Sequence, residues 1–470
     1  MNASLASLVY VCGIAGLFYL DRDDSVRTSK ALWLPVMYLW ILGSRPLSVW
    51  LGATPSFDSQ VEGSPIDGAF YAILLIAALI VVAHRAQRKL NLLQASIPAP
   101  ILIYFIFCLC SVCWSDYPVL AFKKWIKSVG DLAMILIVVT DAQPIAALRR
   151  LFSRVGFILL PLSVVFIKYY PNLGRTYEPW SGAQMVTGVT LDKNLLGVIT
   201  FVLSLGTIWS VLALFGPEAT APDRRRHLVA QGALLAIGVW LLISANSATA
   251  LACFILGAGL MLATKLRLFR RNPAAVHVLV VLLAVGASGV ILFGGRATAA
   301  AALGRNATLT GRTDIWAAIV PMATNPLVGA GFESFWLNPN VHRRLWQLFP
   351  GLPLNEAHNG YIEMYLELGW LGLVLIWLIL IDGYRRSVKA FRRIPALGGL
   401  LIAYVLSAMV YNVTEAGFRM LHPMWIFFLL AVIEATSIAA GVVKASQPLD
   451  ASPDRIYGLP ARNLEMRPTR

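Results

Sequence analysis

Four short segments of the 470-residue chain combine cations, polar side chains and glycine. They are GRTYEPWSGAQMVTGVTLDKN (174–194), LTGRTDIW (309–316), NEAHNGYIEMYLE (355–367) and NVTEAGF (412–418). Arginine and lysine stabilise negative charge, and histidine exchanges a proton near neutral pH. These segments therefore hold the candidate residues for a reaction that needs both properties.

His358 is the most informative single residue of these segments. It is one of six histidines, it directly precedes an apolar stretch, and Tyr361 and Glu363 follow it. A neutral imidazole at this place can accept the proton of a sugar hydroxyl, with Glu363 as the reserve base. An interfacial histidine stacked among tyrosines explains the residue equally well, so both interpretations stay open.

Arg312 can clamp a phosphate, because a planar guanidinium binds two phosphate oxygens at once. The alternative is a salt bridge to the neighbouring Asp314 or a surface anchor. Lys193 and Arg175 have the same two interpretations, as phosphate contacts or as side chains that snorkel to lipid headgroups. The candidates for contacts to a diphosphate or a glycan are Lys193, Arg175, Asn194, Asn359, Tyr361, Glu363 and Glu415.

Composition restricts the class of protein. The chain is 58% hydrophobic and only 13% charged, and 39 Lys and Arg against 24 Asp and Glu give a net charge of +15. Soluble domains carry about a quarter charged residues. We therefore exclude a soluble enzyme, a disordered protein and a nucleic-acid binder, and we predict a polytopic membrane protein.

Cysteine usage predicts neither a disulfide framework nor a zinc site. The five cysteines fall in or beside apolar runs, without a histidine at ligand spacing. They are Cys12, Cys108, Cys110, Cys113 and Cys253. The sequence therefore predicts no metal site and no cofactor.

A bilayer core of about 30 Å needs about 20 mostly apolar residues per helix. Thirteen stretches fit, at residues 5–20, 32–51, 66–83, 98–113, 121–139, 151–167, 195–214, 228–243, 248–263, 276–293, 361–381, 397–413 and 423–440. Because residues 1–4 carry no positive charge, we expect the first stretch to be a span rather than a cleaved signal. The predicted fold is all-α, with about thirteen transmembrane helices.

Basic residues indicate the orientation of these spans. Lys and Arg gather in the loops after odd-numbered spans, for example at 224–226 and 385–393, whereas the second loop offers only Asp58, Glu62 and Asp67. Cytoplasmic loops are rich in Lys and Arg. We therefore expect the N-terminus and all four polar segments on the external side and the C-terminus on the cytoplasmic side.

The predicted domain organisation is a transmembrane domain at 1–443 and a disordered cytoplasmic tail at 444–470. The longest external loop, 294–360, belongs to the transmembrane domain and contains helix-like stretches at 311–323 and 341–348. Long loops are usually functional. We expect this loop to form a folded, partly helical cap.

These motifs resemble the O-antigen ligase and polysaccharide polymerase superfamily of bacterial inner membranes, in particular its exopolysaccharide polymerase branch. Its amino-terminal half is similar to GSRPLSVWL (43–51) and SVCWSDYPVLAFKKW (111–125), and later segments to TGVTLDKNLLG (187–197), SANSATAL (244–251) and NVTEAGF. The most specific resemblance lies in LTGRTDIWAAIVPMATNPLVGAGFESFW (309–336), followed by AHNGYIEMYLELGWLG (357–372).

The resemblance implies a GT-C-like, inverting, metal-independent glycosyltransferase whose active site faces the periplasm. Its donor would be a glycan on undecaprenyl diphosphate, its acceptor a second glycan, and other polysaccharide-assembly proteins would be possible partners. The family's functional arginine and histidine correspond to Arg312 and His358. A fixed cation near the diphosphate and one base for the acceptor hydroxyl are the chemistry that such a transfer needs.

Two departures from the family pattern affect the interpretation. Ligases that attach glycan to lipid A core resemble S-R-G-A in the short outer turn, whereas this chain has NSAT at 246–249, without arginine. Polymerases often show H-K-N where this chain has Asp192 before Lys193 and Asn194. The first departure favours a polymerase over a ligase. A lipid-linked oligosaccharide flippase or exporter, or a membrane scaffold, are the alternatives from other classes.

Overall fold

The computed structural model describes residues 2–23, 26–54, 63–177, 182–215, 224–292, 309–351 and 354–441, and the statements below concern these ranges. The α-helices are α1 (Ala3–Leu20), α2 (Trp33–Leu42), α3 (Leu47–Trp50), α5 (Pro65–Ser96), α6 (Ala99–Ser111), α7 (Pro118–Val139), α8 (Pro144–Tyr169), α9 (Pro171–Gly174), α10 (Lys193–Ala213), α11 (Arg224–Ala245), α12 (Ala248–Ala263), α13 (Arg267–Arg271), α14 (Pro273–Leu292), α16 (Leu309–Ile319), α17 (Pro339–Leu348), α18 (Gly360–Arg393), α19 (Pro395–Tyr411) and α20 (Pro423–Ala439). Short 3₁₀ turns lie at Lys30–Leu32, Val112–Trp114, Val320–Met322 and Phe335–Leu337.

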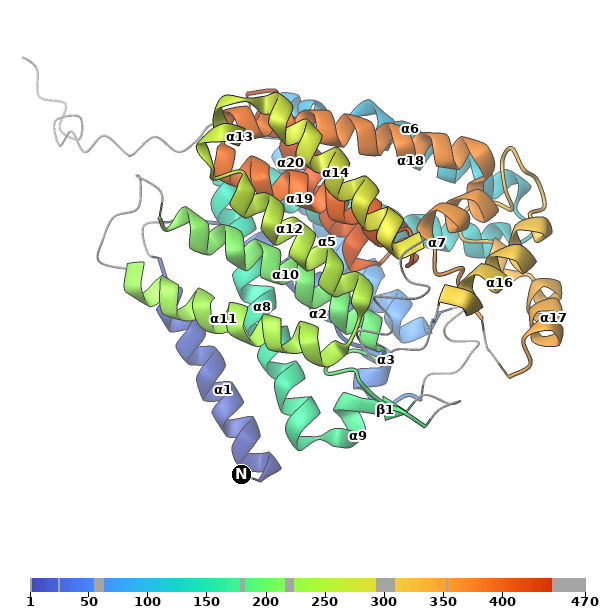
Figure 1. Ribbon diagram of the computed structural model, residues 1–470, viewed down its shortest axis with the longest axis horizontal. Coiled ribbons are helices and arrows are strands. Elements are labelled where there is room, and N and C mark those ends of the chain that lie inside the picture. The colour runs from blue at the N-terminus through green and yellow to red at the C-terminus, as the bar shows by residue number, and fades with distance from the viewer. Residues whose placement is uncertain are drawn as a thin grey trace, which may run out of the picture.

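The bundle is organised around its C-terminal helices (Figure 1). Every residue of α20 from Pro423 to Ile438 is buried, and α19 is buried along most of its length. By contrast, only 6% of the apolar window of α1 and 11% of that of α5 are buried. Apolar helices with unburied apolar sides fit a lipid surrounding, in which such sides cost no free energy.

Each of the thirteen predicted spans overlaps at least one helix among the described residues. Six helices are long and apolar enough to cross a membrane by length and composition, namely α1, the 65–87 part of α5, α8, α10, α11 and α18. The chain is therefore a multi-pass membrane protein, whereas thirteen crossings and a GT-C-like arrangement stay predictions. The predicted span 32–51 is wrong as one helix, because α2 ends at Leu42 and α3 begins only after Pro46.

Two short strands modify the all-α prediction. β1 (Arg175–Tyr177) pairs antiparallel with β2 (Gln184–Val186), with Thr176 opposite Met185. This hairpin lies in the polar segment 174–194, which we predicted to be external, directly after α9. The rest of the described chain is helical or irregular, so the hairpin is a local elaboration of a helical fold.

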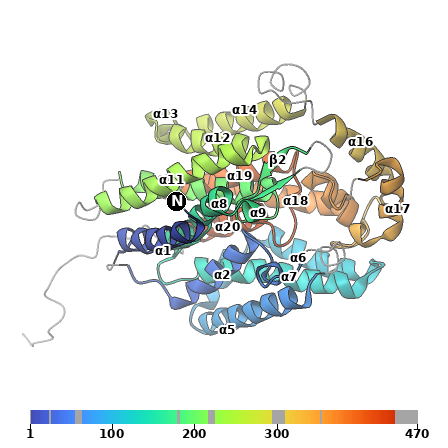
Figure 2. The same ribbon diagram turned by 90° about the horizontal axis from the view of Figure 1, so that it is seen from below.

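Residues 309–351, which we name the cap, lie at one end of the bundle, where α16 and α17 are neighbours in both views (Figures 1 and 2). The two helices correspond to the helix-like stretches expected in the long loop. The cap has its own hydrophobic cluster, which includes Ile319, Phe335 and Leu345. It therefore packs as a small folded unit on the end of α18.

Helix α18 is broken where the cap inserts. Gly369 has a φ of 64°, and a Cβ there would lie 2.3 Å from the carbonyl carbon of Leu327. The broken turn hydrogen-bonds to the cap, since Trp370 N donates to Pro326 O and Leu371 N to Leu327 O. Only glycine adopts this conformation at so close an approach without strain. The predicted tail at 444–470 lies outside the described residues.

Candidate active site at the cap end of the bundle

The backbone of the candidate site joins the start of α18 to the turn after α19. Gly360 N donates to Asn412 O at 2.9 Å and to Glu415 O at 3.0 Å. A Cβ on Gly360 would lie 1.9 Å from Asn412 Oδ1, which itself accepts hydrogen bonds from Gly417 N and Phe418 N at 2.8 Å each. Glycine at 360 therefore permits the close approach that brings His358 and Glu415 together.

His358 lies between two carboxylates. Its Nδ1 is 2.7 Å from Glu356 Oε1 and 3.7 Å from Glu415 Oε2. Its φ of 50° is in the left-handed region, which turns the chain sharply just before α18 begins. The other oxygen of Glu356 accepts from Arg419 Nη1 at 3.0 Å. The imidazole thus lies at ion-pair distance from Glu356, which Arg419 holds in turn, an arrangement similar to the base and third group of catalytic triads.

Arg312 reaches one of these carboxylates, Glu415, from the cap. Its Nη2 donates to Glu415 Oε1 at 3.0 Å, and its Nη1 donates to the Thr414 carbonyl. One turn later, Trp316 Nε1 donates to Ala357 O at 2.8 Å and fixes α16 beside the histidine. The predicted functional pair is therefore joined through Glu415. The alternative salt bridge from Arg312 to Asp314 is replaced by these contacts.

The electrostatics of this group, which we name the His358 cluster (Arg312, Glu356, His358, Glu415 and Arg419), favour a protonated histidine. Burial lowers the pKa of His358, but hydrogen bonds with Glu356 and Glu415 outweigh burial and raise the pKa to about 10. Burial raises the pKa of Glu356, but the bond with His358 and the charge of Arg419 bring that pKa down to about 2. Three cations against two carboxylates leave a net charge of +1. The cluster therefore attracts an anion.

The same carboxylates are also close enough to hold a metal ion. The ligand atoms of Glu356, His358 and Glu415 lie within 4.8 Å of one another. However, all four carboxylate oxygens already have partners, which are His358, Arg419, Arg312 and the Asn194 amide at 3.4 Å. A cation would have to displace two arginines, so the donor set fits an anion site better than a metal site.

Two predicted glycan contacts, Asn359 and Tyr361, instead support the local structure. Asn359 caps α18 through bonds from Tyr361 N and Ile362 N, and its amide donates to Val413 O at 2.9 Å. Tyr361 donates to Met409 O at 3.0 Å and stacks on Trp377. The polar atoms of Asn359 and Tyr361 are therefore engaged by the protein itself.

Glu363, the reserve base, anchors the cap. Its Oε2 accepts from Trp336 Nε1 at 2.7 Å, and its Oε1 accepts from Ala357 N at 2.6 Å. One turn along α18, Glu367 accepts from Ser334 N and Phe335 N. The two buried carboxylates thus hold the cap on α18, and both oxygens of Glu363 are taken.

The remaining candidates divide between two places. Asn194 joins the His358 cluster through Glu415, and Lys193 is the half-buried residue before it. Asp192, whose role the sequence left open, caps α10 by accepting from Asn194 N and Leu195 N. Arg175 lies on β1, where its Nε donates to Ile167 O at 2.9 Å. In the described part of the chain, no contact joins Arg175 to the cluster.

Sequence reasoning missed Glu356 and Arg419 as members of the site. Glu356 stands two residues before His358, and Arg419 follows NVTEAGF directly, so both belong to or adjoin segments already singled out. Their positions in or next to these segments could have marked both residues as candidates, but only the fold shows that they pair with each other. The short turn at 246–249 also adjoins the site, because Thr249 Oγ1 lies 2.8 Å from Thr414 Oγ1.

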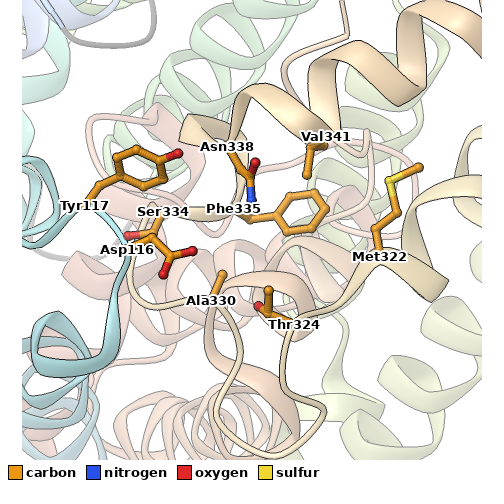
Figure 3. Close-up of a pocket in the computed structure, with 9 residues that line it drawn as sticks. All are labelled: Asp116, Tyr117, Met322, Thr324, Ala330, Ser334, Phe335, Asn338 and Val341. Atoms are coloured by element: carbon orange, nitrogen blue, oxygen red, sulfur yellow. The ribbon is translucent and has the colours of Figure 1, made fainter.

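A small cavity lies beneath the cap and is not the substrate site. Its volume of about 20 Å³ holds about one water molecule. Figure 3 shows that Tyr117 and Asp116 face Ser334 and Phe335 across it. Oligosaccharides need a far larger space, so this cavity is too small to hold one.

The bundle and the cluster together define a multi-pass helical membrane protein with a cationic, carboxylate-braced site beneath a cap. Residues 233–377, which include Arg312 and His358, match a family model described as O-Antigen ligase. Over 300 residues the chain is 27% identical to the exopolysaccharide production protein ExoQ of Rhizobium meliloti (strain 1021), covering 62% of this chain and 65% of that relative. The chain is therefore similar to the O-antigen ligase and polysaccharide polymerase family over these ranges, and the match spans less than two thirds of the relative's length.

Proposed function

We propose that the chain is a membrane glycosyltransferase that joins undecaprenyl-diphosphate-linked oligosaccharide repeat units during exopolysaccharide or O-antigen synthesis. The observation that carries this proposal is the His358 cluster, which combines an imidazole between two carboxylates with fixed cations. Three of its five members, Arg312, Glu356 and His358, lie inside the family match. We further propose that the cluster faces the periplasm of a bacterial inner membrane, where other polysaccharide-assembly proteins can act with it.

The proposed reaction is a single inverting displacement. The acceptor hydroxyl attacks the anomeric carbon, the bond from that carbon to the lipid diphosphate breaks, and the diphosphate departs with the electron pair. Negative charge grows on the leaving diphosphate, and cations held by hydrogen bonds in a fixed position stabilise it without reorganising. Arg312, with Lys193 nearby, is the proposed source of that stabilisation. This displacement requires neither a metal ion nor a carboxylate nucleophile.

The hydroxyl proton needs an acceptor, and we assign His358 to it. With Nδ1 facing Glu356, Nε2 of the neutral imidazole is the nitrogen left for the acceptor hydroxyl. A pKa of about 10 means that roughly one molecule in 10³ carries the neutral imidazole at pH 7. That form is a strong base, which offsets part of its rarity. The proposal therefore requires activity to rise with pH.

The decisive test uses purified full-length protein in lipid, supplied with a lipid-linked repeat unit and EDTA but no nucleotide. We expect the repeat units to be joined into longer lipid-linked chains, and His358→Gln, which keeps a hydrogen-bonding group but takes no proton near neutral pH, to stop that reaction. Lipid-linked repeat units that cross the membrane without lengthening would instead identify a flippase or exporter.

Orientation has its own test. Single cysteines at positions 193, 312 and 358, in a background without the native cysteines, should react with an impermeant maleimide in cells with a permeabilised outer membrane. A cysteine at position 225 should not react. Labelling at 225 alone would place the site on the cytoplasmic side and contradict a periplasmic polymerase.

Transfer to lipid A core is the second candidate reaction. The His358 cluster can act in the same way in this transfer, because its donor and its leaving group are the same as those of the proposed polymerisation. The short turn at 246–249 favours polymerisation, because it brings Thr249 rather than an arginine to the edge of the cluster at Thr414. Supplying lipid A core as acceptor in the same assay separates the two reactions by their product.

A further inference from the structure

A second feature with binding character lies between α5 and α7. The cavity there has a volume of about 380 Å³, within the range of small-molecule sites. Its wall is mainly apolar, formed by side chains such as Tyr71, Leu75 and Leu120, and three lysines from α7 line it as well. This combination is unlike a packing defect, because defects between helices are apolar throughout.

The cavity lies beside the lipid. Figure 2 shows α5 along one edge of the molecule, with α7 on its inner side. Ile73 and Ile76 of α5, on the helix that forms one wall, are 66% and 59% exposed. The helix that forms one wall of the cavity therefore borders the lipid.

The three lysines are Lys123, Lys124 and Lys127, all within the first ten residues of α7. Lys124 Nζ donates to Glu333 O at 3.0 Å, which ties this end of α7 to the cap. In the described ranges, Lys123 and Lys127 have no carboxylate within ion-pair distance. Asp67, on α5, instead accepts hydrogen bonds from the backbone N and the hydroxyl of Ser48. Two cations are thus available to an anionic head group at the mouth of an apolar cavity.

The cavity is connected to the candidate active site through Asp131. Its Oδ1 accepts from Tyr38, a cavity-wall residue, at 2.6 Å, and its Oδ2 accepts from Leu421 N at 3.2 Å. Leu421 follows Glu415 and Arg419 in the turn that carries the His358 cluster. One buried carboxylate therefore links the cavity wall to that turn.

We propose that this cavity binds a second lipid carrier, with part of its polyprenyl chain between α5 and α7 and its diphosphate at Lys123 and Lys127. The inference rests on the proposed function, because joining two lipid-linked glycans requires two carriers held at once. The His358 cluster is the proposed site of the first carrier. A diphosphate carries more negative charge than a phospholipid head group, so a pair of unpaired lysines selects it by charge.

The proposal is tested by measuring lipid binding in the absence of the joining reaction. Full-length protein in phosphatidylcholine nanodiscs is titrated with polyprenyl diphosphate, and bound lipids are counted by native mass spectrometry. We expect two per protein. Lys123→Gln/Lys127→Gln should weaken one of them at least tenfold, whereas Lys265→Gln/Lys389→Gln, an equal charge change at other helix ends, should keep both.

A second variant keeps every lysine. A Cβ at Gly68 would meet nothing within 4 Å, so Gly68→Leu fits the helix and fills the cavity. It should lose the same bound lipid as the lysine variant. Two lipids retained in both variants, or equal displacement by phosphatidylglycerol, would overturn the proposal.

The outcomes separate this inference from the proposed function. If the lysine-dependent lipid is absent but repeat units are still joined, only the second-carrier site is wrong. If the lipid binds at the lysines but Arg312→Gln and His358→Gln leave lipid binding and turnover unchanged, the cavity is a lipid-diphosphate site and the assigned chemistry of the His358 cluster fails.

Discussion

Replacing Glu356 by glutamine tests the charge state on which the proposed mechanism depends. Glu356 Oε1 lies 2.7 Å from His358 Nδ1 and is the main reason that the pKa of this histidine rises to about 10. Glutamine keeps the size and an oxygen for the hydrogen bond but removes the negative charge. We therefore expect Glu356→Gln to bring the pKa of His358 down towards the ordinary value of about 6.5.

The size of the effect follows from the two pKa values. At pH 7.5, a pKa of about 10 leaves about 0.3% of the imidazole neutral, whereas a pKa of about 6.5 leaves about 90% neutral, a ratio of the order of 10². A general base acts in its neutral form, so its activity rises with pH and levels off above its pKa. The plateau of the variant should therefore begin up to about three pH units lower than that of the wild type.

The assay is the initial rate of repeat-unit joining between pH 6 and pH 10.5 in lipid, at saturating donor. Glu333→Gln is the matched control, because it removes a carboxylate at the same end of the bundle that pairs with Lys124 rather than with His358. Its profile should follow that of the wild type. The midpoint of the profile, rather than the absolute rate, is the readout, since glutamine also changes how firmly the imidazole is oriented.

The opposite profile would refute the reasoning. If wild-type activity is flat near neutral pH and falls as pH rises through about 10, His358 acts as a cation. Glu356→Gln would then lose activity at pH 7.5, because deprotonation begins at lower pH. A general base and a cationic group thus give profiles of opposite slope.

Four further predictions concern the site and its support. Arg312→Lys should keep the charge but lose most polymer yield, because lysine cannot bond Glu415 and the Thr414 carbonyl with one planar group, while Asp314→Ala should match the wild type; equal damage from both would indicate a local salt bridge. Asn359→Ala should lower the free energy of unfolding by about 0.5–2 kcal/mol through loss of the α18 cap, measured by thermal melting in detergent, and an unchanged melting temperature would count against the cap. Gly369→Ala should destabilise or displace the cap, seen as faster proteolysis within 309–351, because its Cβ would overlap Leu327. Dialysis against EDTA should leave the rate of repeat-unit joining unchanged, and rescue by an added divalent cation would instead assign a metal to Glu356, His358 and Glu415.

Much of this protein is determined by its sequence alone, because a membrane imposes strong and local rules. Each helix must satisfy its own backbone and present an apolar surface, so hydropathy located a helix at all thirteen predicted stretches. The motifs around Arg312 and His358 likewise carried the family, which the comparisons confirm. The break after Leu42 was missed because Gly43 and Pro46 lie within an otherwise apolar stretch.

Pairing within the site was decided only by the tertiary structure. Sequence proximity suggested Arg312 with Asp314, but α16 packs so that the guanidinium meets Glu415, over a hundred residues away. Asn359 and Glu363 looked like substrate contacts, yet their polar atoms cap α18 and hold the cap. The charge on His358 is set by Glu356 and Glu415 together, which no pattern along the chain specifies. The sequence states which residue types are present, whereas their pKa values and their partners depend on distances that only the folded chain creates.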